Sequence, residues 1–153
     1  MSAHAAKQPS PVKILLGIVA VLWGLEIVDT LLLGGSLDGL GLRPRTLGGL
    51  WGLVTAPFLH AGFGHLASTT APFLVLGALM LMRGVSDFVG ATIVITLLGG
   101  LGVWIFGRSA THIGASGLIF GYLGFLLLVG FLERSILGIL VSVGVGVVYG
   151  GML

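Results

Sequence analysis

The chain has 153 residues, of which 56% are hydrophobic and 8% are charged, and its formal net charge is +2. A soluble domain carries about 25% charged residues because its surface must be hydrated, so much of this surface must face lipid. The small net charge and the lack of a basic run or phosphate-binding glycine loop argue against nucleic acid as a partner. The 28 glycines favour closely packed membrane helices.

Five apolar segments are long enough to cross a bilayer, which takes about twenty residues of helix. We therefore predict an all-α fold, a polytopic helical membrane protein with five transmembrane helices. Residues 1–11 are expected to form a short disordered tail, and residues 12–153 a single membrane domain. The predicted spans cover residues 12–33, 63–82, 87–106, 115–131 and 135–153.

Residues 34–59 are too rich in glycine, proline and charge for one membrane helix. They predict a membrane-associated loop with short helical pieces, in which Trp51 is an interfacial anchor. Pro72 lies inside the second span and predicts a kink or an unpaired carbonyl. Glu26 and Asp29 lie in the second half of the first span, where we expect them near the headgroups.

The positive charges orient the chain only weakly. With a cytoplasmic N-terminus, four cationic residues lie inside and three outside, which is the arrangement that the positive-inside rule favours. The inner four are Lys7, Lys13, Arg83 and Arg134, and the outer three are Arg43, Arg45 and Arg108.

A serine flanked by glycines precedes the fourth apolar run, in the segment His112-Ile-Gly-Ala-Ser116-Gly117. Glycine lets another backbone approach closely. The start of a helix also offers unpaired N–H groups and a positive dipole end, which would stabilise an oxyanion formed at Ser116. The alternative is plain small-residue packing, since Gly117 and Gly121 are four residues apart.

A second polar cluster begins with His60 and His65 and continues to Thr69. His65 and Thr69 are four residues apart and so share one helix face, where both could donate hydrogen bonds to one point. A zinc site is disfavoured because the histidines are five apart and neither a carboxylate nor a cysteine lies nearby. A pair of interfacial histidines with ordinary loop hydrogen bonds stays open as an alternative.

Together the two clusters resemble the rhomboid family of intramembrane serine proteases. The family pattern is Phe-Leu-His, a second histidine five residues on, an asparagine four residues later, and Gly-x-Ser-Gly opening the fourth helix. The matching segments here are Phe58-Leu59-His60, His65, Thr69 in place of the asparagine, and Gly114-Ala115-Ser116-Gly117. The resemblance extends over residues 13–153 and includes the broken loop after the first span.

The resemblance implies a role for each matching residue. Ser116 would be the nucleophile, and its backbone N–H, His65 and Thr69 would form the oxyanion hole. His60, Gly114 and Gly117 would support the site. Phe120, one turn after Ser116, would pack on the catalytic histidine.

Two departures from the family pattern bear on activity. Thr69 replaces an amide donor with a shorter hydroxyl, which can still donate one hydrogen bond. The family's general base is a histidine on a sixth helix, whereas this sequence has no histidine after His112. We expect the base beyond Leu153, on a span absent from this sequence, with His112 as the alternative.

The favoured function is therefore an intramembrane serine endopeptidase with a Ser–His dyad, acting on transmembrane segments of other proteins. It would need the lipid bilayer and neither a metal nor an organic cofactor, and it would reside in a bacterial cell membrane. The alternative is an inactive rhomboid-like protein that binds transmembrane helices. A small transporter is disfavoured because no paired, broken mid-membrane helices occur.

Overall fold

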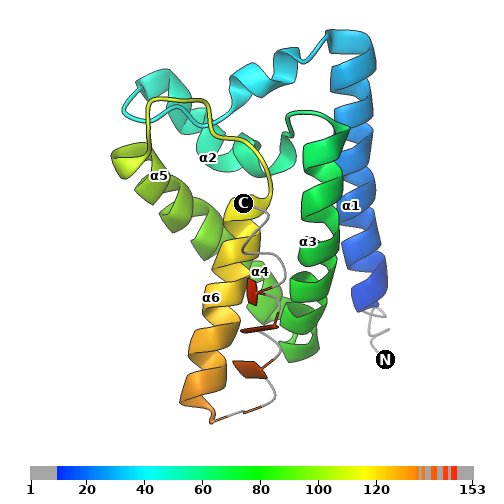
Figure 1. Ribbon diagram of the computed structural model, residues 1–153, viewed down its shortest axis with the longest axis vertical. Coiled ribbons are helices and arrows are strands. Elements are labelled where there is room, and N and C mark those ends of the chain that lie inside the picture. The colour runs from blue at the N-terminus through cyan, green and yellow to red at the C-terminus, as the bar shows by residue number, and fades with distance from the viewer. Residues whose placement is uncertain (1–9, 135, 137–138, 141–142, 145, 148–153) are drawn as a thin grey trace, which may run out of the picture.

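The computed structural model describes residues 10–134, 136, 139–140, 143–144 and 146–147, and this part of the chain is helical (Figure 1). Three continuous helical segments are long and apolar enough to cross a membrane, at Pro11–Leu33, Phe63–Arg83 and Val85–Phe106. A shorter apolar helix follows them. The helices are α1 (Pro11–Val28), α2 (Gly52–Thr55), α3 (Phe63–Arg83), α4 (Val85–Val94), α5 (Gly100–Phe106) and α6 (Ser116–Leu132).

Two of the long segments contain a π-helical turn. Asp29–Leu33 extends α1, and Ile95–Gly99 joins α4 to α5. Three 3₁₀ turns surround α2 in the connection between α1 and α3, at Ser36–Leu40, Leu47–Trp51 and Ala56–Phe58. The predicted loop with short helical pieces is confirmed.

The first four predicted spans agree with the observed helices to within two residues at each end. The first helix begins at Pro11 rather than residue 12, because Ser10 accepts a hydrogen bond from the Lys13 N–H (3.4 Å) and proline suits the first turn. Helix α3 is continuous through Pro72. The predicted tail is described only from residue 10, and the fifth predicted span, 135–153, lies largely outside the described residues.

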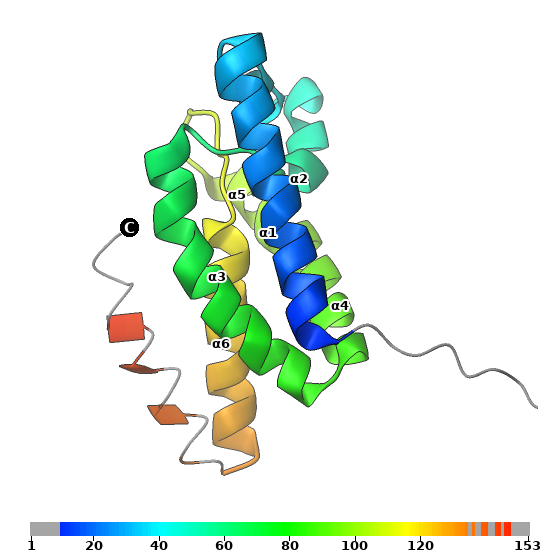
Figure 2. The same cartoon turned by 90° about the vertical axis from the view of Figure 1, so that its right-hand side faces the viewer.

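Helices α1 and α3 run side by side, and α6 lies against α3, as both views show (Figures 1 and 2). Their shared core includes Phe73, Leu76, Met80, Ile119 and Tyr122. The Tyr122 and Thr92 hydroxyls form a 2.6 Å hydrogen bond within this core. Such pairing is required because an unpaired buried hydroxyl costs free energy.

Two carboxylates, one on α1 and one on its π-helical extension, are buried against protein. Glu26 and Asp29 are each only 4% exposed. Glu26 accepts a hydrogen bond from the Thr30 hydroxyl (2.9 Å), and Asp29 accepts one from the Leu37 N–H (2.9 Å). The donor to Glu26 comes from the next turn of the same helical segment. The donor to Asp29 comes from the loop that turns back over the end of this segment, which the sequence pattern does not show.

At the opposite end of the bundle, Arg83 closes α3 against the end of α6. Its guanidinium donates two hydrogen bonds to Glu133, at 3.0 and 2.8 Å, and lies 3.9 Å from Asp87. This hydrogen-bonded pairing with Arg83 lowers the pKa of the Glu133 carboxyl.

We expect Glu133→Gln to lower the midpoint of thermal unfolding slightly at neutral pH, because an exposed ion pair is screened by solvent. A carboxyl with a lowered pKa stabilises the fold above its unfolded pKa and loses that effect as the pH falls. The difference between wild type and variant should therefore shrink in acid and in high salt. Equal midpoints at neutral pH and low salt would contradict this prediction.

Candidate active site

Ser116 is the first residue of α6, and the segment that leads to it is held by hydrogen bonds from three sides. His112 pairs with Leu42 in an antiparallel bridge, with N···O distances of 2.9 and 2.8 Å. The Gly114 N–H donates to the Ala56 carbonyl (2.9 Å), and the Ala115 N–H donates to His60 Nε2 (3.3 Å). The loop between α1 and α3 thus determines where α6 begins.

The start of α6 offers free backbone donors. Among the described hydrogen bonds, none uses the N–H of Ser116, Gly117 or Leu118, and the helix bonding begins with Ile119 N–H to Ala115 O at 3.0 Å. The positive end of the helix dipole adds to this local field. Negative charge that develops on an oxygen beside Ser116 would therefore be stabilised.

His65 lies directly against the segment before Ser116. A Cβ placed on Gly114 would lie 2.7 Å from His65 Cε1 and 3.0 Å from Nε2, and Gly114 has φ +109°, so only glycine suits this position. The Ala61 N–H donates to His65 Nδ1 at 3.4 Å. In the neutral ring this places the proton on Nε2, the nitrogen next to Gly114, where it can serve as a donor.

His60 is buried, with 1% of its surface exposed, and its ring centroid lies 5.3 Å from that of His65. Because Nε2 accepts from Ala115, the neutral ring carries its proton on Nδ1. Burial lowers the pKa of His60 to about 4, and the nearby His65 adds to this shift. His60 is therefore neutral at pH 7 and serves as a hydrogen-bond acceptor that positions the start of α6.

Thr69 lies one turn after His65 on α3 and is buried. Its hydroxyl points back along its own helix, 3.2 Å from the His65 carbonyl and 3.1 Å from the Leu66 carbonyl. The single hydroxyl proton is thus used within α3. An asparagine amide could satisfy a carbonyl and still offer a second N–H. In this rotamer Thr69 does not provide the donor that the sequence pattern predicted.

Phe120 and Gly117 lie on a face of α6 that the described residues leave open. Phe120 is 46% exposed, and a Cβ on Gly117 would have nothing within 4 Å. Gly124, Leu128 and Phe131 continue this exposed stripe at helical spacing. Among the described residues, no histidine lies on this face for Phe120 to pack against.

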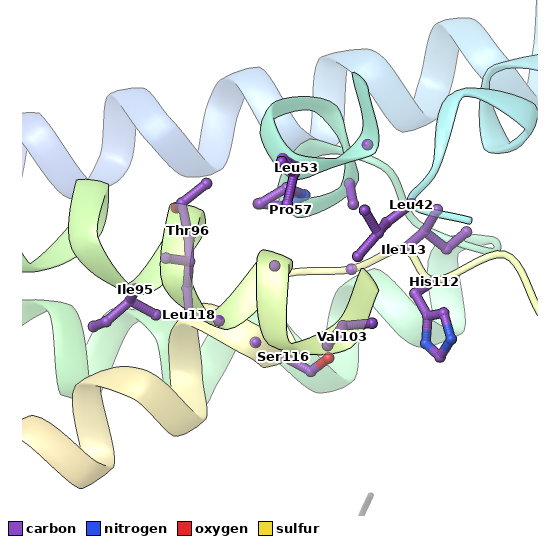
Figure 3. A pocket seen from close by; sticks show the side chains of 16 residues that line it. Leu42, Leu53, Pro57, Ile95, Thr96, Val103, His112, Ile113, Ser116 and Leu118 are labelled. Atoms are coloured by element: carbon purple, nitrogen blue, oxygen red, sulfur yellow. The ribbon is translucent and has the colours of Figure 1, made fainter. Parts of the chain in front are cut away.

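A cavity of about 270 Å³ adjoins Ser116 between α2, α5 and the start of α6 (Figure 3). His112 lies at its rim, and its Nε2 lies 3.0 Å from the Arg108 carbonyl. No described hydrogen bond joins a histidine to Ser116 Oγ. The structure therefore brings His60 and His65 up to the segment before Ser116, and it leaves the serine without a base among the described residues.

Arg45 in the loop is a structural residue that the sequence motifs did not reveal. Its guanidinium donates to the carbonyls of Ile105 (3.1 Å) and Gly107 (2.9 Å) and to Ser109 Oγ (3.2 Å), which caps the end of α5. Cations are favoured at helix C-termini. The sequence did hold a signal for this role. Charged residues are rare in this chain, and a cation such as Arg45 next to an apolar span needs a partner.

No three His, Asp or Glu side chains in the described part of the chain come together in a way that could hold a metal ion. The chemistry that the site can offer from these residues is that of a serine hydroxyl, backbone N–H donors and an imidazole N–H.

The Rhomboid domain family model matches residues 47–153, which include both motifs. The chain belongs to the rhomboid family. YdcA of Bacillus subtilis, which carries the name putative rhomboid protease, is 31% identical over 132 residues, covering 83% of this chain and 66% of that protein.

Mycobacterial proteins are more similar to this rhomboid. An uncharacterized protein of Mycobacterium tuberculosis is 48% identical over 145 residues, covering 91% of this chain and 60% of that protein. An uncharacterized protein of Mycobacterium leprae is 39% identical over 148 residues, covering 91% of this chain and 57% of that protein. The chain thus spans about three fifths of the length of these relatives. No solved structure matches it significantly.

Proposed function

We propose that this rhomboid is an intramembrane serine endopeptidase. The observation that carries the proposal is the arrangement around Ser116: a hydroxyl at the start of α6, unpaired N–H groups in the same turn, and the Nε2 side of His65 against Gly114. Packing alone would not need a neutral, buried His60 to hold the Ala115 N–H.

In the proposed reaction, Ser116 Oγ attacks a peptide carbonyl and an acyl-enzyme forms. The backbone N–H of Ser116 and the His65 Nε2–H stabilise the oxyanion, and each preorganised donor contributes about 3 kcal/mol. Thr69 joins them only if its side chain rotates away from the His65 and Leu66 carbonyls. His60, Gly114 and Gly117 support this geometry.

A serine needs an adjacent base to be a good nucleophile. We propose a histidine beyond Leu153, carried by a helix that packs on the open face of α6 and meets Phe120. The greater length of the relatives supports this proposal. The hydrogen bond between His112 Nε2 and the Arg108 carbonyl argues against His112 as the base.

The proposed substrates are transmembrane segments of other membrane proteins. The loop between α1 and α3 exposes Leu47, Trp51 and Val54, which suits partial insertion into the outer leaflet. The start of α6 lies below this loop (Figure 1), so the serine would act below the membrane surface. We propose a bacterial cell membrane with the N-terminus in the cytoplasm.

The second candidate is a rhomboid that binds transmembrane helices without cleaving them. The inward-bonded Thr69 hydroxyl is the specific observation in its favour, because it leaves the oxyanion site one donor short. Ser116→Ala would then leave partner capture unchanged.

We expect Ser116→Ala to abolish labelling by a serine-directed fluorophosphonate and cleavage of a transmembrane reporter, by about a thousandfold or more. The experiment uses the complete gene product in detergent micelles and in liposomes. Ser86→Ala is the matched control, because Ser86 lies in the first turn of α4, at the opposite end of the bundle. Equal labelling of wild type and Ser116→Ala would remove Ser116 from the mechanism.

A further inference from the structure

A second cavity, of about 150 Å³, lies among α1, α3, α4 and the start of α6. It has only Pro57 and Leu118 in common with the cavity beside Ser116, so the two cavities are distinct. Helices α1 and α4 each pack on α3 and make little contact with each other in the described part of the chain. Both helices contribute to the wall of this second cavity, which therefore lies where they leave room between them.

The second cavity is closed at two ends. A Cβ on Gly77 would lie 2.7 Å from Leu15 Cδ2 and 3.8 Å from Phe88 Cε2, so α1 and α4 both reach α3 at one end. The 3₁₀ turn Ala56–Phe58 covers the other end. Phe58 lines the cavity and is nevertheless 43% exposed, so its ring lies at the boundary between the cavity and the surroundings of the protein.

The walls of the second cavity disfavour water. Thr92 and Tyr122 are the polar residues that line it. The Thr92 hydroxyl donates to the Phe88 carbonyl (2.6 Å), so the Tyr122 hydroxyl donates to Thr92 (2.6 Å) and both hydroxyl protons are used. A buried water needs about two to four polar partners, which these walls do not supply. An empty space would in turn deprive the wall atoms of dispersion contacts.

The depth of the second cavity in the membrane decides which apolar molecule can reach it. Leu22 and Phe73, which both line it, are the middle residues of the spans Pro11–Leu33 and Phe63–Arg83. The middle of the hydrocarbon layer is roughly 15 Å from the headgroups on either side. Headgroups and polar solutes do not reach this depth, whereas the ends of lipid acyl chains do.

We propose that the second cavity binds the end of an acyl chain of a membrane lipid, which enters beside Phe58. An apolar cavity of about 150 Å³ holds a molecule of the size of benzene, so the last few carbons of a chain fit. Because lipid tails are as apolar as leucine, the chain end gains dispersion contacts with the walls and no hydrophobic free energy. The occupant would touch Ala115, whose N–H donates to His60, and would link the surrounding lipid to the start of α6. The proposal is independent of the proposed protease function.

The test is photo-crosslinking in liposomes. The complete gene product is reconstituted in phosphatidylcholine that contains a small fraction of the same lipid with a diazirine at the end of one acyl chain. After irradiation, the modified residues are located by mass spectrometry of peptides. We expect adducts on the cavity residues Phe58, Phe73 and Tyr122. Adducts confined to exposed residues of α1 and α4, such as Val21 and Val89, would overturn the proposal and show that the cavity is closed to lipid.

Two variants fill the second cavity from α1. Ile18→Phe and Leu22→Phe each add volume to its wall, and each should lower the labelling of Phe73 and Tyr122 by about fivefold or more. Leu16→Phe is the matched control, because Leu16 lies on the same helix, is 55% exposed and does not line the cavity. The unfolding midpoint in detergent shows which variants are folded. Unchanged labelling in the folded filling variants would overturn the proposal.

A transmembrane reporter added in excess distinguishes lipid from substrate as the occupant of the second cavity. The Ser116→Ala protein is used for this measurement so that the reporter stays intact. We expect the labelling of Phe73 to persist in the presence of the reporter. Loss of this labelling would overturn the proposal and assign the cavity to the substrate.

Discussion

Replacing Gly52 with alanine should destabilise the protein by about 3 kcal/mol or more, among the largest effects expected of a single methyl group. A Cβ at Gly52 would overlap the backbone N and Cα of Leu42. Backbone atoms cannot move aside as the end of a flexible side chain can. Leu42 is held in turn by its two hydrogen bonds to His112, so relief of the overlap must break that bridge.

The damage should reach Ser116, because the Leu42–His112 bridge is one of the attachments that position the start of α6. We therefore expect Gly52→Ala to lower both the unfolding midpoint in detergent and the rate of fluorophosphonate labelling. Gly48→Ala is the matched control, since a Cβ at Gly48 has nothing within 4 Å. If the two variants were equally stable, the tight contact between Gly52 and Leu42 would be disproved.

Stability should fall as the pH drops from about 6.5 to about 4, with a loss of up to about 3 kcal/mol due to His60. The pKa of His60 is about 4 in the folded protein and 6.5 in its ordinary range. The unfolded chain therefore binds a proton first, and stability is full above pH 6.5 and is lost through this window. Below about pH 4 both states are protonated and the loss stops.

His60→Gln isolates this contribution, because the amide oxygen can still accept from the Ala115 N–H but does not titrate. The variant's unfolding midpoint, measured in detergent between pH 4 and pH 8, should vary less with pH than that of wild type. Parallel pH profiles would show that folding does not lower the pKa of His60.

The helical spans could be predicted because lipid imposes a simple rule. Each backbone polar group in the hydrocarbon core must be paired within the helix, so the apolar stretches and their charged or glycine ends reveal the helices directly. Pro11–Leu33, Phe63–Arg83 and Val85–Phe106 follow this rule closely. The two π-helical turns could not be predicted from hydrophobicity, because they change the backbone hydrogen bonding without changing the apolar character of the segment.

The serine and histidine motifs were also visible in the sequence, since spacing alone places His65 and Thr69 on one helix face and Ser116 at a helix start. Spacing does not show which partner a hydroxyl or an imidazole will form a hydrogen bond with. Thr69 has a carbonyl of its own helix within reach and bonds to it, whereas His65 is anchored by Ala61 in a way that turns its Nε2 toward Gly114.

The sequence by itself therefore determined the class of protein, the limits of its membrane helices and the residues that could react. Only the tertiary structure decided that Glu26 and Asp29 are buried, that the loop binds the segment before Ser116, and that an apolar cavity adjoins the serine. The physical reason is the separation along the chain of the groups that interact. Helix formation in lipid depends on neighbours within a few residues, whereas these contacts join groups far apart in the chain, such as Leu42 with His112 and Ala115 with His60.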